Sequence, residues 1–435
     1  MTKADFLQLL ERALAQLPEE ERQANLEYYS ELLDDMLEEG MTEAEATAKL
    51  GSPSQIAQSI LQEVPLGKLV STRMKPKSGW TPLAIVLAVV GSPVWVPLLL
   101  LAAALVLSLI VAGIVMLIAG YSPIEGYSAM FTGAFGNVSN LAQTLGTATP
   151  LIFAGLAMAF AARGGMFNIG IEGQIIAGAF PAALVGAYVQ GLPWFLHIPL
   201  CFLAGMIGGG VWAAIAGFLK NKLRVSEVIL TIMLNYVAQY LAEYLANYQF
   251  KAEGMLVRTE TILPSATLTP LVPYTRLTGG IFVALAFAVL MWWFLSRTTA
   301  GYQIRAISAN PYAAEAGGIN IARMNLLTMF LSGALAGMGG AVEVLGVHGY
   351  FITNMTSGYG FDGVAIAVMG QYTPLGTVVS ALIFGALRAG STSMNRMTSI
   401  PGEFIQVLQA LVILFVSTPG IVRMFLKKRR QKKEA

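Results

Sequence analysis

Apolar runs close to bilayer length recur along the chain after residue 93, whereas residues 1–70 are polar and rich in acidic side chains. A straight helix needs about 20 apolar residues to cross a bilayer, and short runs interrupted by glycine are typical of broken or re-entrant helices. The sequence therefore predicts an all-α fold, a polytopic membrane helix bundle of about ten transmembrane segments. The segments near 148, 361 and 375 are either broken or re-entrant helices, or longer spans whose limits the apolar pattern misplaces by several residues. The candidate spans are 94–119, 148–162, 169–189, 195–219, 225–249, 279–296, 324–347, 361–371, 375–391 and 404–421.

The first 70 residues show a different pattern, with apolar residues at helical spacing. Thr42 followed by Glu45 matches a capping box and opens a further helix. The break at Gly51–Ser54 caps another helix, which we expect to begin near Gln55. Three or four short helices can share a small core, so this region is predicted to be a compact cytoplasmic helical domain. The periodic residues are Phe6, Leu9, Leu10, Leu14 and Leu17, then Leu26, Tyr29, Leu32, Leu33 and Leu37.

Composition supports two modules of different character. Hydrophobic residues make up 55% of the chain and charged residues only 12%, against about 25% charged in soluble domains. Residues 1–70 hold 14 acidic and 5 basic residues, a net charge of −9, whereas the rest of the chain carries +11. We divide the chain into an acidic helical domain at 1–70, a linker with an interfacial apolar segment at 71–93, a transmembrane domain at 94–421 and a basic cytoplasmic tail at 422–435.

Basic residues predict the orientation, because cytoplasmic loops of membrane proteins carry an excess of lysine and arginine. Ten spans place the basic connections at 220–224 and 297–323 on the cytoplasmic side, together with Arg163 and both termini. The long loop at 251–278 then lies outside. One more crossing at 80–90 would put the acidic domain outside, so we expect this stretch to be interfacial or a shallow hairpin.

A polar segment interrupts the transmembrane domain between residues 163 and 174. Asn168, Glu172 and Gln174 border an apolar span there, and hydrocarbon offers no water to satisfy such groups. Other helices, a water-filled path or a transported solute must face them instead. The alternative is that Asn168 and Glu172 simply cap the helix that begins near Ile169.

Two more polar groups, Asn235 and Tyr236, lie about two turns into the span at 225–249. Asn235 is either part of a polar path or an interhelical hydrogen bond that holds the bundle together. Glu227 stands beside Arg224 near the cytoplasmic end, where we expect it to pair or to cap a helix.

The cytoplasmic connection at 301–319 carries a second candidate site. Asn310 and Pro311 can start a helix, with asparagine as the cap and proline in the first turn. The short helix that follows is rich in small residues, which permits close approach to another protein. It is either a docking element or a mere interhelical connector.

Several chemistries have no support in the sequence. No Gly-x-x-x-x-Gly-Lys-Ser/Thr phosphate loop occurs, and there is no chain of acidic and histidine residues within the spans. His197 and His348 are the only histidines, both at expected outer ends, and we interpret them as interfacial residues. No ligand cluster for a metal is visible, and nothing calls for a cofactor or for nucleic acid.

The N-terminal region resembles the HAAS-type helical signalling domain over about its first 64 residues. The resemblance implies a regulatory or protein-docking role without enzyme activity. The residues that carry it are Thr2–Leu7, Leu17–Glu21, Glu27–Tyr29 and Leu50–Ala57.

From about Gly120 to Thr418 the chain resembles permeases of bacterial ABC importers for nucleosides and simple sugars, within the branched-chain amino acid and ribose permease group. Leu234–Tyr236 favours the nucleoside branch over the sugar branch. The matching elements occur in the family's order and are Gly120–Pro123, Thr149–Ala157, Arg163–Gln174, Ser226–Tyr236, Arg305–Pro311 and Gly358–Val368. Permeases of this kind begin directly with a first span, so the acidic domain of this chain departs from the pattern.

The resemblance implies a multi-pass protein of the bacterial cell membrane, in contact with membrane lipid. It also implies three protein partners, which are a cytoplasmic ABC ATPase subunit, a second permease copy or paralogue, and an extracytoplasmic substrate-binding protein, often a lipoprotein. Hydrolysis would take place in the ATPase, so this chain would have no ATPase site of its own. The segment that would dock on the ATPase contains Arg305, Ser308, Asn310, Pro311, Ala313, Ala314 and Gly317.

A nucleoside is uncharged, with a flat base and a hydroxyl-rich ribose, so its path needs aromatic faces and amide or carboxylate groups. The predicted path residues are Asn168, Glu172, Gln174, Asn235 and Tyr236. Three classes of function stay open from the residues: an ABC permease for nucleosides or simple sugars, a membrane-anchored regulator that acts through residues 1–70, and a carrier or channel without an ATPase.

Overall fold

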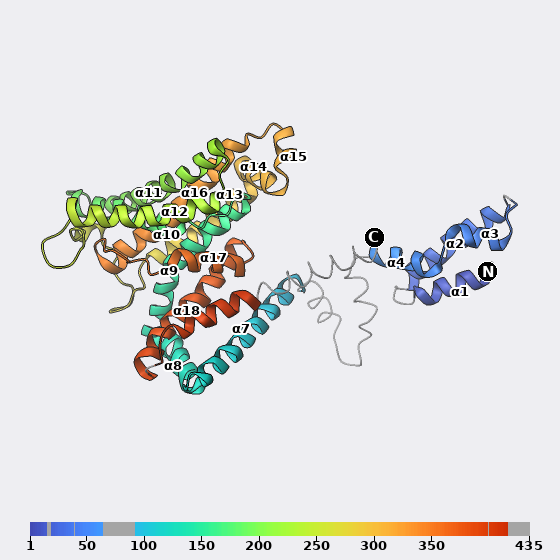
Figure 1. Cartoon of the computed structure of the whole chain (residues 1–435), viewed down its shortest axis with the longest axis horizontal. Helices are drawn as coiled ribbons and strands as arrows, with labels where there is room; N and C mark the ends of the chain where they lie inside the picture. Colours follow the sequence, from blue (N-terminus) through green and yellow to red (C-terminus); the bar gives the residue numbers. More distant parts are fainter. Residues whose placement is uncertain (15–18, 39, 64–91, 399, 416–435) are drawn as a thin grey trace. The chain divides into compact units, whose positions relative to one another are not determined.

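The computed structural model describes residues 1–14, 19–38, 40–63, 92–398 and 400–415, which divide near residue 100 into two compact units (Figure 1). The expected interfacial stretch at 80–90 and the basic tail at 422–435 lie outside these described residues. The proposed domain boundaries at residues 70 and 93 stay predictions.

The N-terminal unit is built from four short helices, as the apolar spacing predicted. They are α1 (Lys3–Ala13), α2 (Glu19–Glu38), α3 (Glu43–Leu50) and α4 (Pro53–Glu63). Their shared core contains Phe6, Leu10, Leu14 and Leu33. Leu9 was expected in this core but is 47% exposed, because its position turns away from the other helices.

Two capping boxes begin helices in this unit. Thr42 and Glu45 cap α3 reciprocally, which confirms the prediction, and Thr2 and Asp5 do the same for α1. These hydrogen bonds lower the pKa of both carboxyl groups, because the threonine hydroxyls and then the threonine amides favour the ionised form. The fourth helix begins at Pro53 rather than near Gln55, since proline fits the first helical turn.

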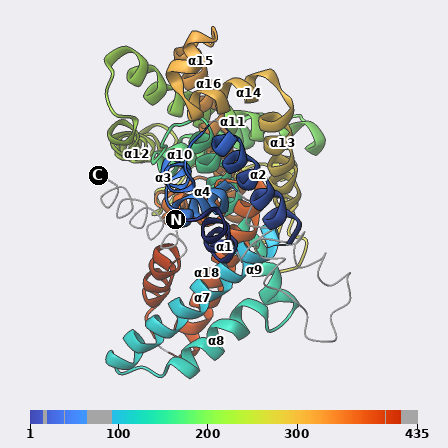
Figure 2. The ribbon, with the colours of Figure 1, turned by 90° about the vertical axis from the view of Figure 1, so that its right-hand side faces the viewer.

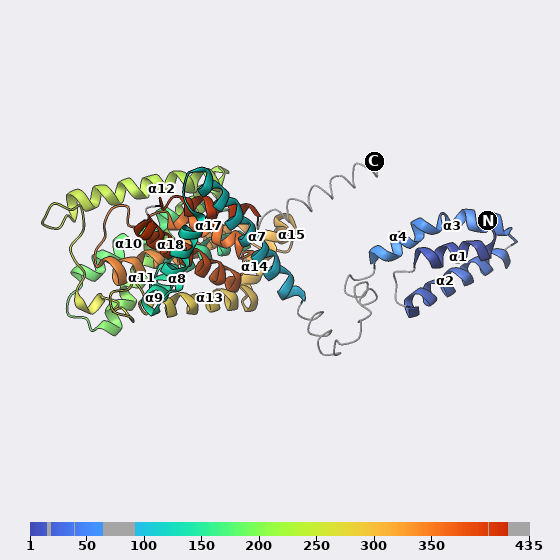
Figure 3. The ribbon, with the colours of Figure 1, turned by 90° about the horizontal axis from the view of Figure 1, so that it is seen from below.

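The membrane unit is a bundle in which each of the ten predicted segments coincides with a helix (Figures 1 and 3). Seven helices of the described residues are long and apolar enough to cross a membrane. The helices are α7 (Ser92–Ile118), α8 (Pro123–Phe135), α9 (Val138–Arg163), α10 (Ile171–Tyr188), α11 (Trp194–Leu223), α12 (Glu227–Tyr244), α13 (Gly280–Arg297), α14 (Thr299–Ala309), α15 (Pro311–Ala316), α16 (Ile321–Glu343), α17 (Tyr359–Met369) and α18 (Pro374–Thr398), followed by a helix at Phe404–Phe415.

Two of the three segments that looked short are full-length helices. α9 has 26 residues and α18 has 25, so neither is broken. Polar residues such as Gln143 and Thr147 in α9 hid its first turns from the apolar pattern. The helix α8 was also not foreseen, and it lies beside α7 and α18 at one edge of the unit (Figure 2).

The third short segment is a true half-helix. α17 has 11 residues, which at 1.5 Å per residue is about half the thickness of the hydrocarbon layer. The non-helical stretch at 349–358 precedes it, with left-handed backbone at Gly349, Asn354, Ser357 and Gly358. Such backbone is tolerated at membrane depth only where protein or water covers it.

The centre of the unit is packed through small residues. α9 is the most enclosed candidate span, and α16 is the next. α11 and α16 approach so closely that a Cβ at Gly337 would lie 2.1 Å from the carbonyl oxygen of Gly205. Association of membrane helices depends on such close backbone contact, because lipid supplies no hydrophobic drive between them.

Hydrogen bonds show at which of the two ends of the bundle each loop between helices lies. At one end, Lys220 bonds Met166 and Asn221 bonds the carbonyl oxygen of Ala322, so the basic connections lie together near α14 and α15 (Figure 1). The loop at 251–278 lies at the opposite end, where the amide of Leu268 donates to the carbonyl of Leu345. This grouping agrees with the predicted orientation, although the side that each end faces stays a prediction.

Candidate functional site

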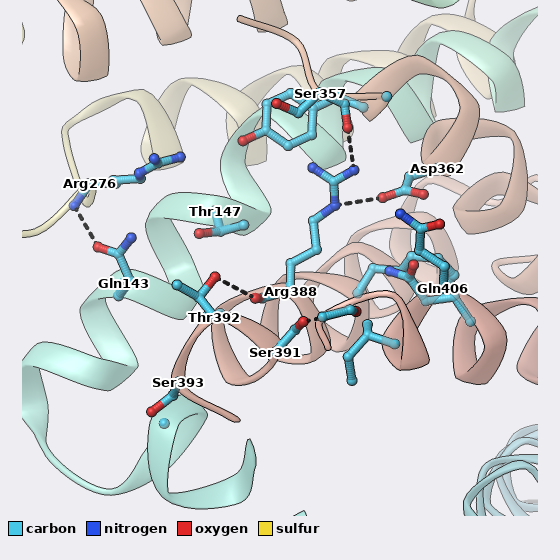
Figure 4. A pocket seen from close by; sticks show the side chains of 18 of the residues that line it. Gln143, Thr147, Arg276, Ser357, Asp362, Arg388, Ser391, Thr392, Ser393 and Gln406 are labelled. Atoms are coloured by element: carbon cyan, nitrogen blue, oxygen red, sulfur yellow. Dashed lines mark hydrogen bonds and ion pairs between the residues drawn. The ribbon is translucent and has the colours of Figure 1, made fainter. Parts of the chain in front are cut away.

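A polar cavity of about 1050 Å³ opens in the membrane unit (Figure 4). This volume is at the top of the roughly 300–1,000 Å³ typical of ligand sites. Its walls come from the end of α8, the start of α9, the first turns of α17, the second half of α18 and the helix at Phe404–Phe415. Tyr274 and Arg276 from the 251–278 loop also line it, so the cavity lies toward that end of the bundle.

Arg388 is the central charge of the cavity wall (Figure 4). Its Nε lies 2.8 Å from a carboxylate oxygen of Asp362, and a terminal nitrogen donates to the carbonyl of Ser357 at 2.7 Å. The guanidinium also stacks 4.6 Å above the ring of Tyr359. These contacts tie α18 to the first turn of α17 and neutralise the arginine charge.

Among the described residues, the enclosed part of the cavity therefore carries no net charge, because its one partly buried cation is paired with its one partly buried anion. Arg276 and Arg396 also line the cavity, but both are exposed to solvent. Such a wall suits an uncharged polar solute better than an ion, because an ion would face no uncompensated opposite charge in the enclosed part.

Carboxamide groups supply hydrogen bonding to the cavity. Gln143 accepts from the amide of Arg276 at 3.2 Å, and Gln406 lies near Asp362 (Figure 4). Gln409 is only 7% exposed, and its Nε2 has no hydrogen-bond partner among the described residues. An unsatisfied buried donor costs about 1–3 kcal/mol. A solute with an acceptor at this point would remove that cost.

Three of the predicted path residues instead hold the turn between α9 and α10 in place. Asn168 is fully buried, bonds Gln174 through both ends of its carboxamide at 2.9 Å, and donates to Ser332 at 2.8 Å. Asn235 donates to the carbonyl of Ile169 at 2.9 Å and accepts from an amide of α10 at 2.8 Å. The alternative that Asn235 holds the bundle together accounts for these bonds.

The other two predicted residues lie elsewhere. Tyr236 is 54% exposed on α12. Glu172 turns its carboxylate toward the start of α17, where it accepts from Thr356 and from the amides of Gly358 and Gly360. None of the five residues lines the polar cavity, and their contact with a substrate stays a prediction.

Sequence reasoning missed the cavity residues, although signals were present. Asp362 and Tyr359 belong to Gly358–Val368, which was noted only as a family element. Arg388 is a charge inside a predicted span, and such a residue is a functional candidate by default. The three residues are not adjacent in sequence, so only the fold brings them together.

The segment expected to dock on an ATPase forms α14 and α15 at the end of the bundle opposite the cavity loop. Asn310 caps α15 by accepting from the amides of Tyr312 and Ala313 at 3.0 and 3.1 Å, and Pro311 begins the helix, as predicted. Ala314 is 5% exposed and packs inward, so it holds α15 in place rather than facing outward. The exposed residues are Arg305, Ser308, Asn310, Pro311, Ala313 and Gly317, with Tyr312 84% exposed among them.

Glu227 forms its ion pair with Lys220, at 2.9 Å, rather than with Arg224. Arg224 adopts a left-handed backbone conformation that ends α11, which separates it from Glu227. His197 is fully buried and bonded to Ser265 of the 251–278 loop and to a carbonyl, so it packs within the bundle, and its place at the membrane interface stays a prediction. No metal-ligand cluster occurs among the described residues.

The long apolar helices and the half-helix α17, beside the polar cavity, define a polytopic membrane protein. Residues 140–417 match the family described as branched-chain amino acid transport system, permease component. The chain belongs to this family. Residues 5–59 match the HAAS family, which confirms the second resemblance. No solved structure matches the chain.

Three relatives illustrate the similarity. The guanosine ABC transporter permease protein NupP of Bacillus subtilis is 37% identical over 335 residues, 76% of this chain and 95% of the relative. The nucleoside ABC transporter permease protein NupB of Lactococcus lactis is 34% identical over 75% of this chain and 92% of its own length. The glucose ABC transporter permease protein TsgB13 of Haloferax volcanii is 31% identical over 72% of this chain and 84% of its own length.

Proposed function

We propose that this chain is the permease subunit of an ATP-driven importer that carries a nucleoside across the cell membrane. The observation that carries this proposal is the similarity to guanosine and nucleoside permeases along nearly their whole length. Transport of a simple sugar is the second candidate, favoured by the similarity to a glucose permease.

The polar cavity is the proposed entry site for the solute. Its enclosed wall is neutral, which fits an uncharged nucleoside, and the free donor of Gln409 suits a carbonyl, ring nitrogen or hydroxyl oxygen. The face of Tyr359 is covered by Arg388, whereas Phe361 at the rim is 55% exposed and offers a ring for stacking. The predicted path residues would contact the solute further along its route, beyond this entry site.

The orientation follows from the same proposal. The end with the 251–278 loop faces outside and receives the solute from a binding protein, while α14, α15 and both termini face the cytoplasm. The exposed side of α15, with Tyr312 and Asn310, docks on a separate ATPase subunit. Hydrolysis takes place there, and this chain converts the ATPase movement into alternating access.

A second permease copy or a paralogue covers α12. Tyr236, Tyr240 and Tyr244 are exposed on this span, and Gln239 and Glu243 lie beside them only partly buried. Lipid cannot satisfy these polar groups, whereas a protein partner or a water-filled path can. The acidic N-terminal unit is proposed to regulate assembly or transport.

Reconstituted uptake tests the function. The chain is purified with its ATPase and binding protein, placed in vesicles, and supplied with labelled nucleosides or glucose with and without ATP. We expect saturable, ATP-dependent nucleoside uptake that disappears when the ATPase subunit carries an inactivating substitution. Preferred glucose uptake would favour the sugar alternative, and uptake without any ATPase subunit would refute the importer mechanism.

A further inference from the structure

The half-helix α17 is held at both ends by one ten-residue segment, Arg163–Glu172, which we call the clamp segment. At the helix start, the Glu172 carboxylate accepts from Thr356 and from the amides of Gly358 and Gly360, the last at 2.6 Å. Beyond the helix end, Nε of Arg163 donates to the carbonyl of Tyr372 at 3.0 Å.

The charges of the clamp segment match the polarity of the helix. The first turn of a helix has unpaired amides and a partial positive charge, which a carboxylate stabilises, and the last turn favours a cation. The start of α17 also seats directly against α10, because a Cβ at Gly360 would lie 2.2 Å from the amide nitrogen of Glu172. The clamp segment therefore packs against the start of α17 and is hydrogen-bonded at both ends of this helix.

The clamp segment also contacts α14, which leads into the proposed ATPase-docking helix. A Cβ at Gly165 would lie 3.2 Å from the Cα of Ser308, and one at Gly164 would lie 3.2 Å from a side-chain carbon of Ile304. Ile304 is fully buried, so it anchors α14 in the bundle core. The turn at Gly164 and Gly165 therefore packs directly against α14.

On its other side, α17 forms part of the cavity wall. Tyr359 and Asp362 lie in its first turn, and both contact Arg388. A shift of α17 would therefore change the contacts that hold Arg388 and the shape of the wall (Figure 4).

We propose that the clamp segment couples the docking face to the cavity, with Glu172 and Arg163 as positioning residues that make α17 follow α14. This inference rests on the proposed function of the cavity and the docking face. Three protein donors already engage the Glu172 carboxylate, and through them it holds the start of α17.

The test compares Glu172→Gln with a matched control, Glu227→Gln. Both glutamates lie at the beginning of a span, but Glu227 pairs with Lys220 and does not hold α17. In the full reconstituted complex, Glu172→Gln is expected to lower the nucleoside moved per ATP about tenfold, because charge-assisted bonds are lost. Its ATPase rate and assembled amount should stay near the control, and Glu172→Asp should restore part of the coupling.

A second readout is independent of the solute. Cys201 is the chain's only cysteine and is buried, so Thr392→Cys in the cavity wall can be labelled selectively. We expect its labelling rate to change between nucleotide-free and vanadate-trapped complexes, and this change to shrink in Glu172→Gln. Arg163→Gln, which releases the other end of α17, should have the same effect and replaces Glu172→Gln if that variant does not assemble.

The outcomes separate the two proposals. If the unsubstituted complex moves no nucleoside but the labelling change still depends on Glu172, the proposed function fails and the coupling stands. Equal behaviour of Glu172→Gln and Glu227→Gln would overturn the coupling. A parallel loss of assembly, ATPase rate and uptake in the Glu172 and Arg163 variants would reduce them to packing residues. A selective loss of affinity for particular nucleosides with intact coupling would make Glu172 a substrate ligand.

Discussion

Replacement of Asp362 by asparagine tests whether the cavity depends on a neutral, fixed arginine. The substitution keeps the shape of the side chain but removes the anion that lies 2.8 Å from Arg388. Arg388 keeps its bond to the Ser357 carbonyl and its contact with the Tyr359 ring. Any loss of uptake in this variant therefore reports on the charge pair alone.

The size of the effect follows from burial. Removal of one partner of a fully buried ion pair costs about 3–5 kcal/mol. The side chains of Arg388 and Asp362 are 23% and 18% exposed, and Arg388 keeps two contacts, so solvent screens part of this loss. We expect about 1–3 kcal/mol, which corresponds to roughly a fivefold to hundredfold change in an equilibrium constant. The equilibrium constant between the intact and the disrupted cavity falls by that factor, so the intact fraction decreases and the apparent KM for nucleoside rises by up to the same factor.

The assay is nucleoside uptake in vesicles at a series of concentrations, for Asp362→Asn, Arg388→Gln and the double variant. Arg396→Gln is the control, because Arg396 lines the same cavity but is solvent-exposed, and its KM should change less than about twofold. If the pair acts as a unit, the double variant is milder than the sum of the single variants. An unchanged KM for Asp362→Asn, or strict additivity, would refute the reasoning.

Three further predictions use other parts of the chain. Gln409→Leu removes the unpartnered donor, so it should weaken nucleoside uptake several-fold without lowering the thermal stability of the purified complex. A drop in thermal stability would mean that the Gln409 donor already has a hydrogen-bond partner within the complex. Asn310→Ala removes the cap of α15 and destabilises this helix by about 0.5–2 kcal/mol. A pull-down with the variant should therefore recover less ATPase subunit. Undiminished recovery would contradict docking through α15. The pKa values of Asp5 and Glu45 lie below their ordinary 3.8 and 4.5, so their contribution to stability is present above those values and is lost as pH falls through the folded pKa. The protection factors of the α1 and α3 amides in the full chain, taken relative to the intrinsic exchange rate at each pH, should therefore fall below about pH 4.5, and pH-independent protection would contradict it.

The local patterns of this chain determined its class and its elements. Ten apolar segments predicted ten of the described helices of the membrane unit, though not α8 or α14. Thr42 with Glu45 predicted the start of α3. Hydropathy and capping could do this because they depend on residues close together in sequence. The limits of α9 were wrong for a physical reason. Gln143 and Thr147 are polar, but they face a polar cavity rather than lipid, and hydropathy cannot distinguish the two.

The site was decided by the tertiary structure alone. Asp362 and Arg388 pair only because α17 and α18 pack side by side, and Glu172 turns toward α17 although the sequence equally allowed it to cap its own helix. Sequence reveals which polar groups are costly in a membrane. The fold decides which partner satisfies each of them, since the partner comes from a helix distant along the chain.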